Sequence, residues 1–182
     1  MKVNVKFNYQ DYLLMPEDKR CEIIEGDLLM TPAPRPKHQE ILRKLFDILE
    51  THVLKHKSGN IYFAPTDVFF SQENIVQPDL LFISKDRLGI IKDKYIQGPP
   101  DLVVEVLSPS DRERDTEIKR KLYAKYGVRE FWLVDPEADT VEVAVLKEAG
   151  LVTERVYSAG TKTRSPLLAR LTFDPARIFS PE

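Results

Sequence analysis

The sequence predicts an α/β or α+β domain with a central mixed β-sheet flanked by helices, and three features of the 182-residue chain predict it. Residues 38–54 carry apolar side chains at helical spacing, several β-rich runs follow, and a strand–helix–strand unit occupies residues 101–135. Such a unit joins parallel strands through a right-handed crossover, whereas hairpins join antiparallel strands. We therefore expect both kinds of pairing in one sheet, and the length predicts one domain over residues 1–182.

The N-terminal part is expected to contain a short helix and a pair of strands. Asn8 is a suitable cap for a helix that runs to Met15. The run CEIIEGDLLM (21–30) is typical of a strand or hairpin edge interrupted at its Glu-Gly pair. The Pro-rich segment 31–37 disfavours both helix and strand. From His38, the run HQEILRKLFDILETHVL predicts a long amphipathic helix.

The middle of the chain is rich in β-forming residues. The runs IYFAPTDVFF (61–70) and NIVQPDLLFIS (74–84) are separated by three polar residues and predict a hairpin. RLGIIKDKYIQGPP (87–100) is expected to form a short helix or an irregular crossing. DLVVEVL (101–107) is typical of a buried strand.

The C-terminal part begins with a helix signal. SPSD (108–111) predicts a helix N-cap, and the helix that follows is expected to end at Gly127. EFWLVDP (130–136) predicts the parallel partner strand. TVEVAVLK and LVTERVYS alternate as a C-terminal β-hairpin at the edge of a sheet would, and the last segment, ending ARIFSPE, is expected to close one side of the core.

Composition limits the function classes. The 27 basic and 29 acidic residues give a net charge of −2, which argues against a strong non-specific nucleic-acid binder but is compatible with a local basic groove. The candidates for such a groove are Lys37, Lys44, Arg112, Arg114 and Arg129.

Several other classes are excluded by pattern. No apolar run approaches the ~18 residues of a membrane helix, and the first residues lack the apolar stretch of a signal peptide. The single cysteine, Cys21, and the three scattered histidines form no zinc pattern. We therefore predict a cytoplasmic protein without membrane contact.

Two carboxylates, Asp79 and Glu105, interrupt apolar strands. By the two-residue period of a strand, each shares a face with aliphatic residues, which are Leu81 and Ile83 for Asp79 and Val103 and Leu107 for Glu105. A carboxylate there needs a partner, which is either a buried cationic side chain, a backbone hydrogen-bond donor, or a divalent cation that accepts several carboxylates. Two such acids on neighbouring strands favour the metal.

The helix after Glu105 offers a cationic partner. At ~100° per residue, Ile118, Leu122 and Tyr126 form its core-facing stripe, with Lys119 on the flank. Lys119 is therefore expected to act as a base or charge partner for Glu105. The alternative is a lysine whose aliphatic stem covers apolar surface.

A set of motifs then occurs in one order along the chain: Glu22 with the Glu-Gly pair of CEIIEGDLL, His38, the Pro-Asp of VQPDLLF, VVEVLSPS, Asp115, Lys119 and Tyr123, and YGVREFWLVDP. Together they resemble the Uma family of putative restriction endonucleases, a branch of the PD-(D/E)XK nuclease superfamily, over Tyr9 to Phe179. The resemblance implies a restriction-endonuclease-like core in αβββαβ order, to which the C-terminal hairpin is added.

The resemblance also implies a metal site. Asp79, Glu105 and the backbone carbonyl of Val106 would ligate Mg²⁺ or Mn²⁺, and Glu22 would be a further acid near the metal. Mg²⁺ prefers oxygen ligands and keeps several waters, so this set is sufficient.

The catalytic lysine departs from the superfamily pattern, which places it two residues after the glutamate, where this chain has Leu107. In the Uma branch the lysine comes from the following helix, which implies Lys119. His38 and Asp115 match family positions and are candidates for supporting roles.

Two functions from different classes follow. The first is a metal-dependent nuclease that hydrolyses phosphodiester bonds in DNA, since carboxylate-held divalent ions can activate water and neutralise charge in the transition state. The alternative is a catalytically inactive nuclease-fold oligomer that binds nucleic acid or a protein partner. A homodimer or higher homo-oligomer is expected, because superfamily nucleases often cut two strands with two sites and the C-terminal hairpin offers an edge.

Overall fold

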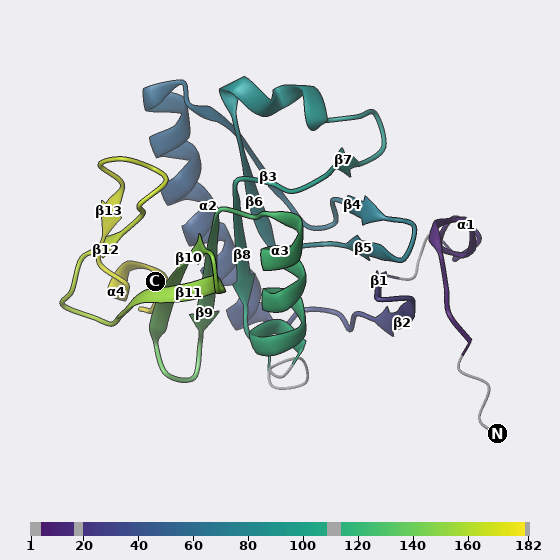
Figure 1. The fold of residues 1–182 in the computed structure, drawn as a ribbon. Helices are drawn as coiled ribbons and strands as arrows, with labels where there is room; N and C mark the ends of the chain where they lie inside the picture. The colour runs from purple at the N-terminus through teal and green to yellow at the C-terminus, as the bar shows by residue number, and fades with distance from the viewer. Residues whose placement is uncertain (1–4, 17–19, 109–113, 181–182) are drawn as a thin grey trace.

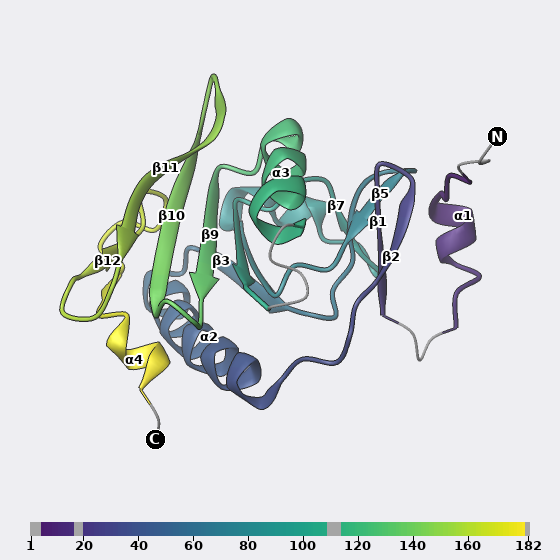
Figure 2. The ribbon, with the colours of Figure 1, turned by 90° about the horizontal axis from the view of Figure 1, so that it is seen from below.

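The computed structural model describes residues 5–16, 20–108 and 114–180, without the side chains of Arg114 and Asp115. A mixed β-sheet forms its centre (Figures 1 and 2). Helix α2 (Pro36–His56) packs on one face of this sheet and helix α3 (Arg120–Tyr126) on the other. The predicted architecture of a mixed sheet flanked by helices is confirmed.

The central sheet has six strands in the order β11-β10-β9-β8-β6-β3. Strands β8 and β9 are parallel and every other neighbouring pair is antiparallel, as the strand–helix–strand unit predicts. The strand bounds are β3 (Gly59–Phe63), β6 (Leu80–Ser84), β8 (Leu102–Val106), β9 (Glu130–Asp135), β10 (Thr140–Lys147) and β11 (Gly150–Tyr157).

A second sheet of five strands stands beside the first, in the order β2-β1-β5-β4-β7. Its bounds are β1 (Cys21–Ile24), β2 (Asp27–Met30), β4 (Val68–Ser71), β5 (Asn74–Val76) and β7 (Ile96–Gln97). The remaining elements are short: α1 (Tyr9–Tyr12), the 3₁₀ helix η1 (Lys85–Ile90), β12 (Thr163–Arg164), β13 (Thr172–Phe173) and α4 (Ala176–Phe179).

The predicted hairpin of runs 61–70 and 74–84 is wrong as a single unit, because each run divides between the two sheets. Strands β3 and β6 pair in the central sheet, whereas β4 and β5 form a hairpin in the second sheet. Pro65 and Pro78 lie where the chain passes from one sheet to the other. Proline cannot donate a ladder hydrogen bond, which explains why each run breaks there.

The predicted N-terminal elements are present with shifted ends. The Asn8 side chain caps α1 in a capping box, but the helix ends at Tyr12 rather than Met15. Helix α2 begins at Pro36, two residues before His38, because proline is well tolerated in the first turn.

The core consists of two layers, one on each face of the central sheet. Residues of α2 pack with alternate strand residues such as Leu80 and Phe82, whereas Leu81 and Ile83 face α3. The alternation predicted for the aliphatic residues beside Asp79 and Glu105 is therefore confirmed. Ile178 of α4 is buried in the first layer, so the C-terminal segment closes one side of the core as expected.

The helix after β8 differs from the predicted amphipathic stripe. Residues Arg114–Lys119 form a π-helical turn (η2) that leads into α3. Because π-helical bonding joins i to i+5, it changes the face that each residue presents. Ile118, predicted to face the core, is 45% exposed, while Lys119 is 3% exposed. The predicted end at Gly127 is confirmed by its left-handed φ of 88°.

The predicted cap within SPSD (108–111) falls mostly outside the described residues. The C-terminal β10–β11 hairpin is confirmed at the edge of the central sheet. No helix in the described ranges is long and apolar enough to cross a membrane.

Candidate functional site

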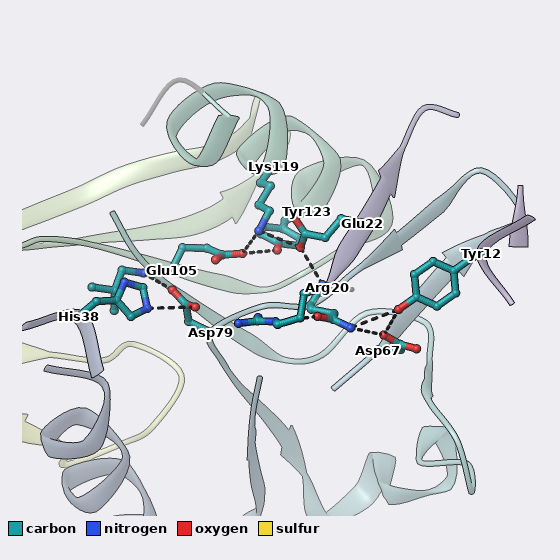
Figure 3. A network of polar contacts seen from close by, with 11 residues as sticks. Tyr12, Arg20, Glu22, His38, Asp67, Asp79, Glu105, Lys119 and Tyr123 are labelled. Carbon is teal, nitrogen blue, oxygen red and sulfur yellow. Dashed lines mark hydrogen bonds and ion pairs between the residues drawn. The ribbon is translucent and has the colours of Figure 1, made fainter. Parts of the chain in front are cut away.

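Three buried charged side chains meet where the two sheets and the π-helical turn come together (Figure 3). Glu22 comes from β1, Glu105 from β8 and Lys119 from η2, and they are 1%, 2% and 3% exposed. The Lys119 Nζ lies 3.0 Å from Glu22 Oε1 and 3.1 Å from Glu105 Oε1. We call these three residues the acid–lysine cluster. The predicted contact between Lys119 and Glu105 is confirmed.

Neighbouring groups fix the two carboxylates. The Tyr123 hydroxyl, one turn after Lys119, donates a 2.5 Å hydrogen bond to Glu105 Oε1. The backbone N–H of Gln77 donates to Glu22 Oε1 at 2.8 Å. The side chains of the cluster come from β1, β8 and η2, and they are held by hydrogen bonds from α3 and from the segment before β6. These hydrogen bonds give the cluster a defined geometry.

The second oxygen of Glu22 is an exception. Its Oε2 is buried and has no hydrogen-bond partner among the described residues. A buried carboxylate oxygen without a donor or cation is unfavourable, and such atoms are uncommon in folded proteins. A cation or an ordered water beside Glu22 would satisfy this atom.

Asp79 lies next to the cluster, directly before β6. Its Oδ2 accepts a 2.8 Å hydrogen bond from the backbone N–H of Val106, the residue after Glu105. His38 Nε2, in the first turn of α2, lies 3.3 Å from Asp79 Oδ1. The two side chains are 16% and 13% exposed, so water and small ions reach the site more readily here than at the acid–lysine cluster.

The fold thus brings together most of the predicted site residues. Glu22, Glu105 and Lys119 are in direct contact, and Asp79 with His38 adjoins them through the β8 backbone. The side chain of the predicted Asp115 lies outside the description. The catalytic and metal-binding roles of all these residues stay predictions, and so does the role of the Val106 carbonyl as a metal ligand.

The predicted metal ligands are few, and all of them are oxygen donors. Within the described ranges, no group of three or more His, Cys, Asp and Glu side chains is arranged to hold a metal ion. The predicted ligand set, however, contains only two carboxylates, Asp79 and Glu105, with one carbonyl. Such a partial set suits Mg²⁺, which keeps several of its waters. The unpartnered Glu22 Oε2 agrees with a cation or its water close by.

Within the described part of the chain, the basic residues predicted for a groove contact groups other than this site. Lys37 donates to the Pro136 carbonyl and Lys44 to the Ser180 carbonyl, while Arg129 pairs with the buried Asp101. The other two candidates, Arg112 and the Arg114 side chain, lie outside the described part.

A network around the Gln77 side chain was not predicted from the sequence. Its Oε1 accepts from Arg20 Nε at 3.3 Å, and its Nε2 donates to Asp67 Oδ1 at 2.9 Å. The Tyr12 hydroxyl donates to the same Asp67 oxygen at 2.7 Å (Figure 3). Burial and the hydrogen bond to Asp67 raise the pKa of Tyr12, so its hydroxyl stays a donor at neutral pH.

This network connects the N-terminal helix α1 to the site, since Gln77 holds Glu22 through its backbone and precedes Asp79 by two residues. Tyr12 and Asp67 are 55 positions apart, and no local pattern pairs residues at that separation. The position of Gln77 beside the Pro-Asp motif is the one signal that the sequence offers.

Comparison with solved structures shows a fold similar to this one. A putative nuclease belonging to DUF820 from Anabaena variabilis ATCC 29413 matches with a TM-score of 0.80 and 22% sequence identity, over 96% of this chain and 98% of that chain. Comparison with curated proteins finds no match.

The family comparison is more specific than the fold comparison. The model of Uma2, described as a putative restriction endonuclease, matches residues 9–176, which is nearly the whole chain. The match includes every residue of the acid–lysine cluster as well as His38 and Asp79. The chain therefore belongs to the Uma2 family of putative restriction endonucleases.

Proposed function

We propose that this protein is a metal-dependent nuclease that hydrolyses phosphodiester bonds in DNA. The observation that carries the proposal is the buried acid–lysine cluster beside the more accessible Asp79. Family membership and the likeness to a putative nuclease support it. A cluster of this kind is unusual in a protein core, because buried charges are unfavourable unless they are paired or bind metal.

Asp79, Glu105 and the Val106 carbonyl are the groups that would hold Mg²⁺ or Mn²⁺. When bound, the ion would supply an activated water and neutralise charge on the phosphate. Glu22 supports the site from the other sheet, since its Oε1 fixes the Lys119 ammonium 3.0 Å away.

Lys119 is suited to donate hydrogen bonds to a phosphate oxygen or to the attacking water. Its ammonium is held within 3.1 Å of both carboxylates, so its position is fixed before substrate binds. His38 fixes Asp79 in the same way at 3.3 Å, and Tyr123 fixes Glu105. For Asp115 we propose a supporting role on the family resemblance alone.

The proposal includes a homodimer, in which two sites cut two strands. Strand β11 ends the central sheet and offers an edge for self-association. Sedimentation equilibrium tests this part separately, with a mass of twice the 21.0 kDa chain as the expected result.

The test is cleavage of single-stranded, double-stranded and branched DNA in Mg²⁺ or Mn²⁺. We expect Asp79→Asn to lower the cleavage rate by about 100-fold or more, because a metal ligand is lost. The matched control is Asp139→Asn, the same substitution at an exposed turn, which should cleave as the parent does. Absence of cleavage on all three substrates, or full activity in Asp79→Asn, would contradict the proposal.

A second function is favoured by one observation. Lys119 already pairs with both carboxylates, so the cluster can join β1, β8 and the helix without a metal. An inactive nuclease-fold protein that binds nucleic acid or a protein partner would keep such a cluster for stability. It predicts DNA binding without turnover in the same assays.

A further inference from the structure

A cleft of about 540 Å³ lies along one flank of α2, separate from the acid–lysine cluster. We call it the α2 cleft. One wall is a stripe of α2 at helical spacing, and the opposite wall comes from residues 170–172 and α4. The lining residues are Lys44, Asp47, Ile48, Thr51, His52, Lys55, His56, Arg170, Leu171, Thr172 and Arg177.

The charge of this cleft is strongly positive in a chain whose net charge is −2. Its single acid, Asp47, lies 3.4 Å from Arg43, and Lys44 is matched by Glu40 at 2.7 Å. The charges of these pairs cancel, so the other cations that line the cleft determine its charge.

Three cations in the cleft have no acidic partner. Among the described residues, Lys55, Arg170 and Arg177 form no ion pair with any carboxylate. Burial lowers the pKa of His52, and the neighbouring charges of His56 and Lys55 lower it further. The positive charge of Lys55, Arg170 and Arg177 is therefore unmatched among the described residues, and an anion is the ligand that would neutralise it.

The length of the cleft indicates an extended anion. From Lys44 to His56 the α2 wall spans thirteen residues, or ~18 Å at the rise of an α-helix. A nucleic-acid strand carries one phosphate per ~3.4 Å of duplex axis, so several phosphates fit along this distance, whereas one phosphate ion would occupy a small part of it.

We propose that the α2 cleft binds the phosphate backbone of a nucleic-acid strand. The inference rests on the proposed nuclease function, because the strand is taken to be the substrate. Lys44 and Lys55 follow His38 by six and seventeen residues, which is ~9 and ~26 Å along α2. At ~100° per residue, Lys44 and Lys55 also lie ~120° and ~100° around the helix from His38, so a strand held at the candidate site would pass around α2 to reach the cleft. Contacts to phosphate in the cleft would then fix its path without reading its sequence.

The experiment measures binding rather than cleavage. Fluorescence anisotropy with labelled 20-nucleotide single strands and duplexes, in EDTA and with the Asp79→Asn chain, removes turnover from the readout. The test variant adds Lys55→Gln, Arg170→Gln and Arg177→Gln. The matched control adds Lys121→Gln, Lys147→Gln and Arg155→Gln, which remove the same charge at positions that do not line the cleft.

We expect the variant that lacks the three cleft cations to lose affinity by roughly 60-fold at 0.15 M salt, since each lost phosphate contact is worth about fourfold through counterion release and three such factors multiply. The slope of log K against log salt should fall by about 2 to 3. The control variant should lose about threefold or less. Thermal unfolding checks that each variant folds, and the single variants Lys55→Gln and Arg177→Gln, each expected to lose about fourfold, replace the triple one if it does not.

Three outcomes would overturn the inference. The first is an equal loss of affinity in the test and control variants, and the second is no binding of either oligonucleotide by the parent. The third is displacement of the labelled oligonucleotide by millimolar inorganic phosphate as efficiently as by unlabelled oligonucleotide. The last would indicate a site for a single phosphate. Binding with the expected loss but no cleavage in Mg²⁺ or Mn²⁺ would contradict only the proposed nuclease function.

Discussion

Lys119 determines the electrostatics of the candidate site, because one buried ammonium is shared by the carboxylates of Glu22 and Glu105. Charges removed from water are stable only when each has a close partner of opposite sign. Loss of the ammonium would leave two carboxylates facing each other in a region that is almost fully buried.

We therefore expect Lys119→Met to lower the free energy of unfolding by about 3–5 kcal/mol, measured by urea denaturation at neutral pH. The matched control is Lys121→Met, two residues along the same helix, whose side chain is 81% exposed and which should change stability by about 0.5 kcal/mol or less. Similar stability of the two variants would show that Lys119 does not hold the carboxylates together.

At this scale, the partnership of Lys119 with Glu105 could be predicted from the sequence, but the burial of Lys119 could not. A helical wheel at ~100° per residue places Ile118 inside and Lys119 on the flank. The π-helical turn exposes Ile118 and buries Lys119. Hydrogen bonding from i to i+5 has no recognisable signal in the residues themselves.

Among the elements, the segment that joins β5 to β6 has the greatest influence on the site. Gln77 donates its backbone N–H to Glu22, and its side chain is held by Arg20 and Asp67. Asp79 follows two residues later and binds the backbone of β8. This short segment therefore holds Glu22 of the five-stranded sheet and also places Asp79 beside β8 of the six-stranded sheet.

Gln77→Ala keeps the backbone hydrogen bond to Glu22 but removes the side-chain anchors. We expect a loss of about 1–2 kcal/mol in the free energy of unfolding, from the partly buried hydrogen bonds. We also expect kcat for DNA cleavage to fall by more than KM rises, because the acids are less well positioned. Gln72→Ala, in the exposed turn before β5, is the matched control and should change neither quantity. An unchanged kcat in Gln77→Ala would contradict a positioning role.

The division of the strands between two sheets was the main error at the scale of elements. The types of the strands could be predicted from their composition, and the parallel pairing of β8 with β9 from the helix between them. Their assignment to sheets depends on pairings such as β1 with β5, whose residues Ile23 and Ile75 are far apart in the sequence. Pro65 and Pro78 mark the breaks, but they do not indicate which sheet each half joins.

Across the whole molecule, the acid–lysine cluster lies at the junction of the two sheets. Glu22 belongs to the five-stranded sheet and Glu105 to the six-stranded one, and Gln77 connects the cluster to α1 through Tyr12. An ion bound among these groups would interact with both sheets at once. Because the unfolded chain lacks this arrangement, ion binding should stabilise the fold as a whole.

We expect Mn²⁺ at about 100 times its Kd to raise the free energy of unfolding by about 2.7 kcal/mol, which corresponds to a rise in Tm of roughly 5–10 °C for a chain of this size. The reason is that, at the proposed site, Asp79 and Glu105 would act together only in the folded state, so the ion would bind it in preference to the unfolded chain. Thermal melts with Mn²⁺ and then with excess EDTA measure the shift and its reversal. Glu105→Gln should abolish the shift, whereas Glu154→Gln, the same substitution at an exposed position on β11, should retain it. A shift of equal size in both variants would place the ion elsewhere on the protein, and no shift in the parent would contradict the proposed metal site.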